Sequence, residues 1–174
     1  MHQAPQYPAG AHEAPTQRDM DRIAKEIELL AAQPAQLRHC IRGLTHDQLE
    51  TRYRNWTVRQ IVHHLADSTS NFFIRWKLAL TEDHPTIKPY DEGHWVRLPD
   101  SSVADPMLGV QLFEATVARW VFTAKAMRPE DFDRTFYHPQ YQKDVALWQA
   151  ISVYAWHGEH HMGQINWLRV HYHW

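Results

Sequence analysis

Three histidines stand within five positions near the end of the chain, in the segment WHGEHH at residues 156–161. His157 and His161 are four residues apart, so on a helix their Cβ atoms lie about 5–6 Å from each other on one face. Histidine is the side chain that most often binds metal ions in proteins. The spacing therefore predicts that both imidazoles can reach one ion from adjacent turns, whereas His160 is turned to the edge of that face.

A catalytic zinc site usually takes three protein ligands, so this pair needs a third ligand from another element. The segment IVHHLADS at residues 61–68 contains one, because His64 shares a helix face with the apolar Leu65. We predict a metal site formed by His64, His157 and His161, on two helices that converge inside a bundle. The alternative is a histidine pair that is satisfied within the core or partly exposed, in a chain that contains 14 histidines.

Two polar residues are spaced to support these ligands. Asp67 follows His64 by three positions and Gln164 follows His161 by three, so each side chain can hydrogen-bond an imidazole of its own helix. Either residue can equally be an ordinary polar residue of a bundle. The catalytic group itself is left open, as a metal-bound water or a thiolate.

The segment differs from the zincin motif, in which glutamate directly follows the first histidine. Glu159 comes two residues after His157 and points to another side of the helix, so we expect it to be a solvated surface residue. Gly158 and Gly163 each cost a helix about 1 kcal/mol relative to alanine. Close packing of another segment against this helix would explain both glycines.

The elements that must position these residues are helices. Apolar residues recur with helical spacing in four stretches, at about residues 19–43, 57–81, 106–127 and 147–170. Pro34 is expected to interrupt the hydrogen-bond ladder of the first stretch or to restart a helix at its first turn. Thr57 and Gln60 form a T-x-x-Q capping box at the start of the second. No strand pair is predicted, although the connection around residues 128–145 has some extended character.

This pattern predicts an all-α fold, a four-helix bundle. The connection from His84 to Asp105 is rich in proline and long enough to cross the bundle, so the second and third helices can run parallel. Its mixture of aromatic and charged residues favours an ordered covering loop. Among the aromatic residues, Trp56, Tyr90, Trp95 and Trp156 are either core residues or the lining of a pocket.

Composition limits the classes of protein that the chain can belong to. Its 174 residues predict a single domain, residues 1–174, with an extended arm at residues 1–17. A net charge of −2 without a basic block argues against nucleic acid as a partner, and no apolar run approaches the ~20 residues of a membrane helix. The single cysteine, Cys40, and an N-terminus without secretory character predict a cytoplasmic protein.

The chain resembles the DinB/YfiT-like family, and within it the YfiT branch of metal-dependent hydrolases and bacillithiol S-transferases. The resemblance rests on the following segments: YPAG, NWTVRQIVHHLADSTSNFFIRWKLALTED, KPYDEGHW, FYHP and YAWHGEHHMGQI. It implies a bundle with an up-down-down-up course and a cytoplasmic homodimer. It also implies one Zn²⁺ or Ni²⁺ ion per chain, held by His64, His157 and His161. One departure is that Gly93 and His94 stand before Trp95 in the third segment, where His94 could alter substrate choice or add a ligand.

Three readings of the function remain open. Three ligands leave a coordination position for water, whose lowered pKa suits hydrolysis of a small-molecule substrate. The same position can hold a low-molecular-weight thiol, since a metal stabilises the reactive thiolate, and the lack of a carboxylate base slightly favours this S-transferase. The third reading is a non-catalytic metal-binding bundle, which usually needs a fourth protein ligand.

Overall fold

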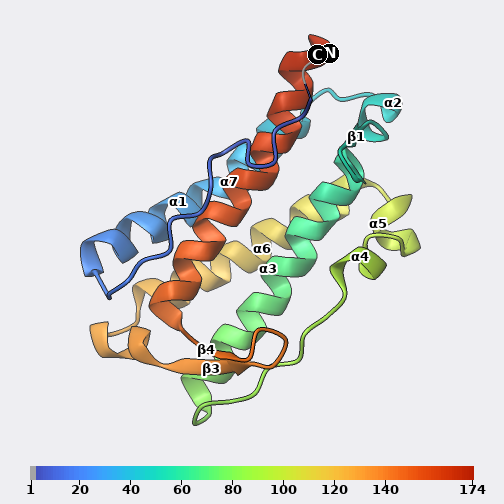
Figure 1. Ribbon diagram of the computed structural model, residues 1–174. Coiled ribbons are helices and arrows are strands. Elements are labelled where there is room, and N and C mark those ends of the chain that lie inside the picture. Colours follow the sequence, from blue (N-terminus) through green and yellow to red (C-terminus); the bar gives the residue numbers. More distant parts are fainter. Residues whose placement is uncertain (1–2) are drawn as a thin grey trace.

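A computed structural model describes residues 3–174 of the chain. Four long helices dominate these residues (Figure 1): α1 (Met20–Ile41), α3 (Val58–Thr81), α6 (Pro106–Lys125) and α7 (Leu147–Tyr172). Between them lie the shorter elements α2 (His46–Leu49), β1 (Arg52–Tyr53), β2 (Trp56–Thr57), α4 (Glu92–Trp95), α5 (Pro99–Ser102), the 3₁₀ turn η1 (Pro129–Asp133), β3 (Thr135–His138) and β4 (Lys143–Ala146). The predicted all-α four-helix bundle is therefore confirmed.

The second and third long helices run in the same direction. Gly109 of α6 lies against His63 of α3, and two helical turns later Thr116 of α6 lies against Ser70 of α3. Residue numbers therefore increase in the same direction along both helices. Both helices therefore start at the same end of the bundle, and the long connection between them crosses from one end to the other (Figure 1).

The first and last long helices also run parallel to each other. Near the start of α1 Arg22 donates to Ser152 of α7, and near its end Cys40 accepts from Arg169. Helices α3 and α7 run in opposite directions, because Ser68 lies beside Tyr154 while His64, earlier on α3, lies beside the later His157. Together these contacts give the expected up-down-down-up course.

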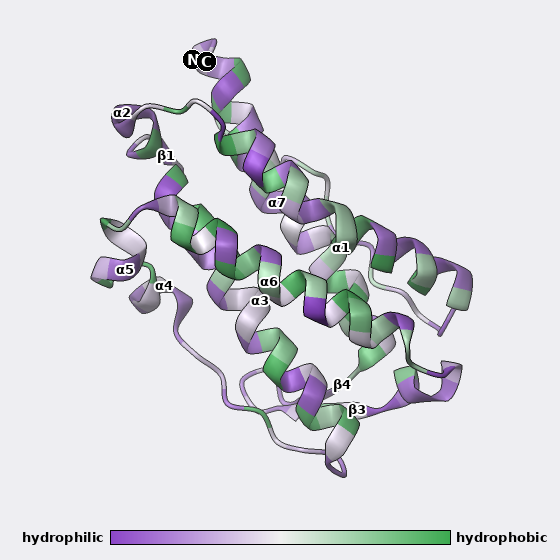
Figure 2. Cartoon of the chain, turned by 180° about the vertical axis from the view of Figure 1, so that it is seen from behind, coloured by the Kyte–Doolittle hydropathy of each residue, from purple (hydrophilic) through white to green (hydrophobic). Residues whose placement is uncertain are grey.

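Large aromatic side chains fill the interior between the helices. Trp76 of α3 and Trp120 of α6 are fully buried, with their rings 5.3 Å apart in an edge-to-face arrangement. Figure 2 shows apolar and polar residues alternating around the long helices, as expected when only one stripe of each helix faces the core.

Pro34 interrupts the hydrogen-bond ladder of the first helix, one of the two predicted alternatives, but it neither ends the helix nor starts a new one. Helix α1 continues through it from Met20 to Ile41. A proline removes one hydrogen bond of the ladder, but buried contacts on both sides of it, at Gln33 and Leu37, keep the helix in place. The helix ends before Gly43, whose positive φ of 72° is favourable for glycine.

Two short hairpins were not predicted. Strand β1 pairs with β2, and β3 pairs with β4, both antiparallel. Strands of two to four residues are too short to show a clear alternation of apolar and polar residues. The covering connection also joins the second hairpin, since the backbone of Ile87 donates to Tyr137.

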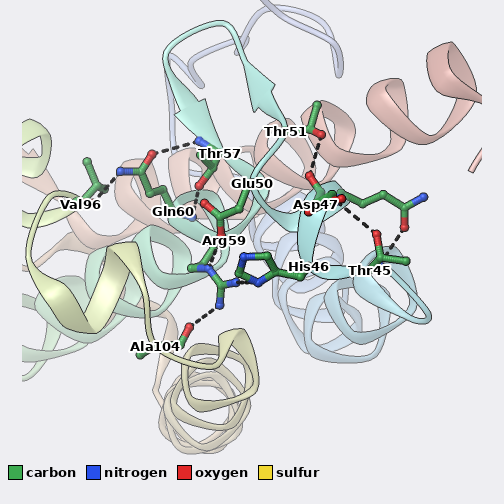
Figure 3. A network of polar contacts seen from close by, with 11 residues as sticks. Thr45, His46, Asp47, Glu50, Thr51, Thr57, Arg59, Gln60, Val96 and Ala104 are labelled. Atoms are coloured by element: carbon green, nitrogen blue, oxygen red, sulfur yellow. Dashed lines mark hydrogen bonds and ion pairs between the residues drawn. The ribbon is translucent and has the colours of Figure 1, made fainter.

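A polar network connects the start of α3 to the neighbouring segments at this end of the bundle (Figure 3). Arg59 donates to the carboxylate of Glu50 at 2.7 Å and to the carbonyl of Ala104. The side chain of Gln60 caps the helix start at Thr57 and donates to the carbonyl of Val96. The network therefore fixes the α3 terminus one turn before His64.

The N-terminal arm lies along α7 (Figure 1). The indole of Trp156 donates to the carbonyl of Gly10, and Pro8 packs against Gly163. Residues 3–17 of the arm contain no helix or strand, whereas the first two residues of the predicted arm lie outside the described residues. None of the helices within residues 3–174 combines the length and the apolar character needed to cross a bilayer.

Candidate metal centre

The structure brings the three predicted histidines to one point between α3 and α7. The Nε2 atom of His157 lies 3.2 Å from that of His64 and 3.1 Å from that of His161. One nitrogen of each ring lies within 4.8 Å of the other two. Three Nε2 atoms that converge from two helices match the donor set of a zinc-type site in a helical bundle.

A hydrogen bond sets the orientation of one of these rings. The Nδ1 atom of His161 lies 2.9 Å from Oε1 of Gln164. An amide oxygen only accepts hydrogen bonds, so Nδ1 carries the proton and the Nε2 lone pair of neutral His161 faces the cluster. This tautomer is the one that binds a metal through Nε2, and an acceptor on the other ring nitrogen is typical of metal-ligating histidines.

The three imidazoles are held in their neutral form. Burial, with a smaller effect of the neighbouring imidazoles, lowers the pKa of His64, His157 and His161 well below the usual value. Neutral imidazole is the form that binds metal ions. Three neighbouring Nε2 lone pairs cannot all find hydrogen-bond donors in one another. A bound cation therefore explains this arrangement better than a set of hydrogen-bonded core histidines does.

Aromatic side chains surround the cluster. The ring of Trp56 lies 4.6 Å from that of His64 and stacks at 6.0 Å on that of His161. On the other side Tyr154 packs 5.5 Å from His157 and donates a hydrogen bond to the carbonyl of Ser68. The apolar walls keep the rings in place and reduce the access of water to them.

A cavity of about 260 Å³ opens beside the cluster, with His64 and His157 in its wall. Helix α3, helix α7, the covering connection and the second hairpin all contribute to the wall. Its other lining residues are Ser68, Phe72, Arg75, Pro89, Tyr90, Glu92, Phe136, His138, Gln140, Tyr141, Lys143, Val145, Ala150, Val153 and Tyr154. The histidine cluster is therefore open to a small molecule.

The residues considered as additional ligands do not join the cluster. His94 is 72% exposed and pairs with Asp91 on the covering connection. His160 hydrogen-bonds the amide nitrogen of Gln164 at the edge of the helix. Among residues 3–174, the cluster consists of three histidines and contains no carboxylate.

The prediction for Glu159 as a solvated residue is wrong. Its side chain is partly buried near the N-terminal arm, one carboxylate oxygen has no hydrogen-bond partner within the described part of the chain, and burial raises its pKa. The arm covers this side of α7, and no sequence pattern revealed that contact. Glu159 does not belong to the histidine cluster and lies instead beside the arm and α1.

The glycines of α7 occupy close contacts with other segments, as predicted. A Cβ atom at Gly158 would lie 2.2 Å from Oε1 of the buried Gln33 of α1. A Cβ atom at Gly163 would lie 3.3 Å from Pro8. The first contact brings α1 close to α7 beside His157, so it helps to set the position of this member of the histidine cluster.

Replacing Gln164 with leucine is expected to weaken metal binding. The substitution removes the acceptor that fixes the Nδ1–H tautomer of His161, and the loss of such a partner typically costs about 10–100-fold in affinity. Competition with a chromophoric chelator measures this effect. Gln164→Glu keeps an acceptor oxygen and is expected to stay close to wild type. Equal affinities for Gln164→Leu and wild type would show that the hydrogen bond has no such role.

Asp67, predicted as a partner of His64, has no hydrogen bond from its carboxylate to any ligand histidine in residues 3–174. Burial, with a smaller contribution from Asp100, raises its pKa from 3.8 to about 6. Folding therefore favours the protonated form. The resulting stabilisation is complete below pH 4 and is lost as the pH rises through 6.

Asp67→Asn is expected to stabilise the protein at pH 8 and to have little effect at pH 4. The gain should be about 1 kcal/mol once solvent screening of this half-buried group is taken into account. Urea unfolding at the two pH values measures it, with the exposed Asp83→Asn as the matched control. A gain of equal size at both pH values would exclude titration of Asp67 as its cause.

The fold and the histidine cluster define a class of protein. A family model described as the DinB superfamily matches residues 28–165. Because the match covers most of the chain, the chain belongs to the DinB superfamily, as the sequence motifs indicated.

Individual relatives narrow the class to the YfiT branch. The chain is 40% identical over 162 residues to "Putative metal-dependent hydrolase YfiT" of Bacillus subtilis (strain 168), covering 92% of this chain and 91% of that protein. It is 44% identical over 161 residues to a similarly named protein of Bacillus mycoides (strain KBAB4), covering 91% and 90%.

A solved structure supports the same conclusion. YfiT from Bacillus subtilis, described as a probable metal-dependent hydrolase with an unusual four-helix bundle topology, superposes with a TM-score of 0.93 at 39% identity. The match covers 97% of both chains. The parallel α3–α6 pair found here is thus shared with a bundle whose topology is described as unusual.

Proposed function

We propose that the protein is a metal-dependent hydrolase of a small-molecule substrate, with His64, His157 and His161 as ligands of one Zn²⁺ or Ni²⁺ ion. The observation that carries the proposal is the convergence of three Nε2 atoms on one point in the wall of a cavity. The names of the relatives, which describe metal-dependent hydrolases, agree with it.

When bound, a divalent ion with three imidazole ligands supplies a Lewis acid and lowers the pKa of a coordinated water towards about 7. The protein's own residues have other tasks. Gln164 orients the ring of His161, and Trp56 packs against two of the three rings. Tyr154 separates the cluster from the aromatic interior. A substrate in the cavity is thereby held beside the ligands and away from bulk water.

Thiol transfer is the second candidate, and one observation favours it. Within the described residues no carboxylate belongs to the histidine cluster, so hydrolysis lacks an adjacent general base. Transfer of a bacillithiol-type thiol to an electrophile needs no such base, because a metal-stabilised thiolate is itself the nucleophile.

A non-catalytic site is disfavoured by the same geometry. A structural zinc site usually has four protein ligands, and neither His94 nor His160 completes the set. The absorption spectrum of the cobalt-substituted protein counts the ligands. A spectrum that changes when azide or a thiol is added indicates an open position, whereas an unresponsive four-ligand spectrum would contradict enzymatic function.

Parallel assays distinguish hydrolysis from thiol transfer. Tag-free protein loaded with Zn²⁺ or Ni²⁺ is incubated with aryl esters and amides, and separately with bacillithiol and a chloro-aromatic acceptor. Hydrolysis that requires the metal supports the proposal. Conjugation without hydrolysis identifies the S-transferase instead. No metal-dependent turnover of either kind on a broad panel would count against both.

We also propose that the protein acts in the cytoplasm as a homodimer. The cytoplasmic location is supported by the single, buried Cys40, and both properties by the resemblance to the YfiT branch. Sedimentation equilibrium of tag-free protein tests the dimer, since a mass of one chain at micromolar concentration would exclude it.

A further inference from the structure

Arg75 is a buried cation that has no ion-pair partner among the described residues. It is 9% exposed, and its guanidinium donates to the carbonyl of Lys88 and lies 5.9 Å from the centre of the Tyr90 ring. Within residues 3–174 no carboxylate forms an ion pair with it. Arginine cannot shed its charge in a protein, so a buried guanidinium without an anion is costly.

This guanidinium lines the same cavity as the metal ligands. His64, Ser68, Phe72 and Arg75 follow one another at helical spacing on α3, which places them on one stripe. Arg75 lies 11 residues after His64, roughly 16 Å along the helix axis. Its side chain leans back towards the start of the helix, so the two functional groups can face one extended molecule.

Two further polar atoms at this end of the cavity lack partners. His138 is 7% exposed, lines the cavity, and its Nδ1 atom has no hydrogen bond within the described part of the chain. The hydroxyl of Tyr90 is likewise buried and unpartnered among these residues. Buried polar groups are nearly always hydrogen-bonded, so two unsatisfied groups near Arg75 favour a polar ligand at this end of the cavity.

Between the two ends the cavity is aromatic. Phe72 stacks on Tyr154 with ring centres 4.0 Å apart, and Phe136 packs 6.2 Å from Phe72. This middle section suits an apolar or aromatic part of a ligand. The cavity therefore has the histidine cluster at one end, an apolar middle and a cationic end.

From this arrangement we propose that Arg75, with His138 and Tyr90, binds the carboxylate of an elongated monocarboxylate substrate whose other end reaches the histidine cluster. The guanidinium fits a carboxylate in a bidentate manner. The wall also contains Lys143 and Glu92, whose charges offset each other, so Arg75 leaves one net positive charge, which matches a monocarboxylate better than a dianion such as phosphate. This proposal depends on the proposed function in one respect only, that the histidine cluster is the place where the substrate reacts.

Binding to metal-free protein tests the subsite separately from the metal. Calorimetry compares 6-phenylhexanoate with its neutral primary amide, using chelator-treated wild type, Arg75→Gln, Arg75→Lys and the exposed Arg119→Gln as control. Wild type and the control are expected to prefer the carboxylate by about tenfold or more, as charged hydrogen bonds do. The preference should disappear in Arg75→Gln and persist in weaker form in Arg75→Lys.

Lack of a carboxylate preference in metal-free wild type would overturn the subsite, whatever the variants do. An unchanged preference in folded Arg75→Gln would overturn it as well. The proposed function is tested by a different result. Carboxylate binding without metal-dependent turnover would contradict the hydrolase but support the subsite, whereas metal-dependent turnover without a carboxylate preference would support the hydrolase and contradict the subsite. Should Arg75→Gln fail to fold, wild type and Arg75→Lys still decide the question.

Discussion

Replacing His157 with alanine is expected to abolish metal binding and every metal-dependent activity. Its Nε2 atom is the one that lies next to the Nε2 atoms of both His64 and His161, at 3.2 Å and 3.1 Å. Two histidines cannot hold a zinc-type ion as three do, and the loss of a direct ligand should exceed the 10–100-fold typical of a supporting residue. Metal content should fall from about one ion per chain to a trace.

Thermal unfolding gives a second readout of the same variant. Because a ligand stabilises the state that binds it, excess Zn²⁺ should raise the Tm of wild type and leave that of His157→Ala unchanged. His94→Ala is the matched control, since His94 is exposed and paired with Asp91 outside the cluster. Full metal content in folded His157→Ala would mean that the ion binds elsewhere.

Gly158→Ala is expected to destabilise the protein by about 2 kcal/mol, although alanine is the better helix former. The new Cβ atom would lie 2.2 Å from Oε1 and 2.3 Å from Cδ of Gln33. Gln33 is fully buried and donates to the carbonyl of Ala155 at 2.7 Å. The Gln33 amide would have to move away and lose this hydrogen bond, which would leave buried polar groups without a partner. Urea unfolding measures the change.

Two comparisons identify the contact as the cause. Gly163→Ala places its Cβ atom 3.3 Å from Pro8, on a surface arm that can shift slightly, so its effect should be small. In the background of Gln33→Ala the obstructing amide is gone, and Gly158→Ala should then cost little or even stabilise the helix. Equal costs in both backgrounds would show that Gln33 is not responsible.

The histidine cluster could be predicted because its signal is local. The i, i+4 spacing of His157 and His161 places both on the apolar stripe of α7, and His64 lies on the corresponding stripe of α3. Helical period and histidine spacing were sufficient to select the three side chains that the structure brings together. Their role as ligands remains a prediction, as does that of Gln164, whose hydrogen bond to His161 the structure shows.

The rest of the site depends on contacts between segments that are far apart in the sequence. The spacing of apolar residues within one segment cannot predict such contacts. Arg75 and His138 come from a helix and a hairpin far apart in the chain and meet only in the cavity wall. Trp56 reaches the ligands from a strand of two residues, too short to be recognised. Glu159 is covered by the N-terminal arm, and Pro34 is tolerated by packing on either side.

Anomalous diffraction at the metal edge, from crystals of tag-free protein, shows directly whether the three histidines hold a metal ion. We predict one ion per chain, about 2.0–2.1 Å from Nε2 of His64, His157 and His161, with at least one further position open to solvent or substrate. An ion bound at other residues, or no ion after loading with Zn²⁺ and Ni²⁺ in turn, would contradict it.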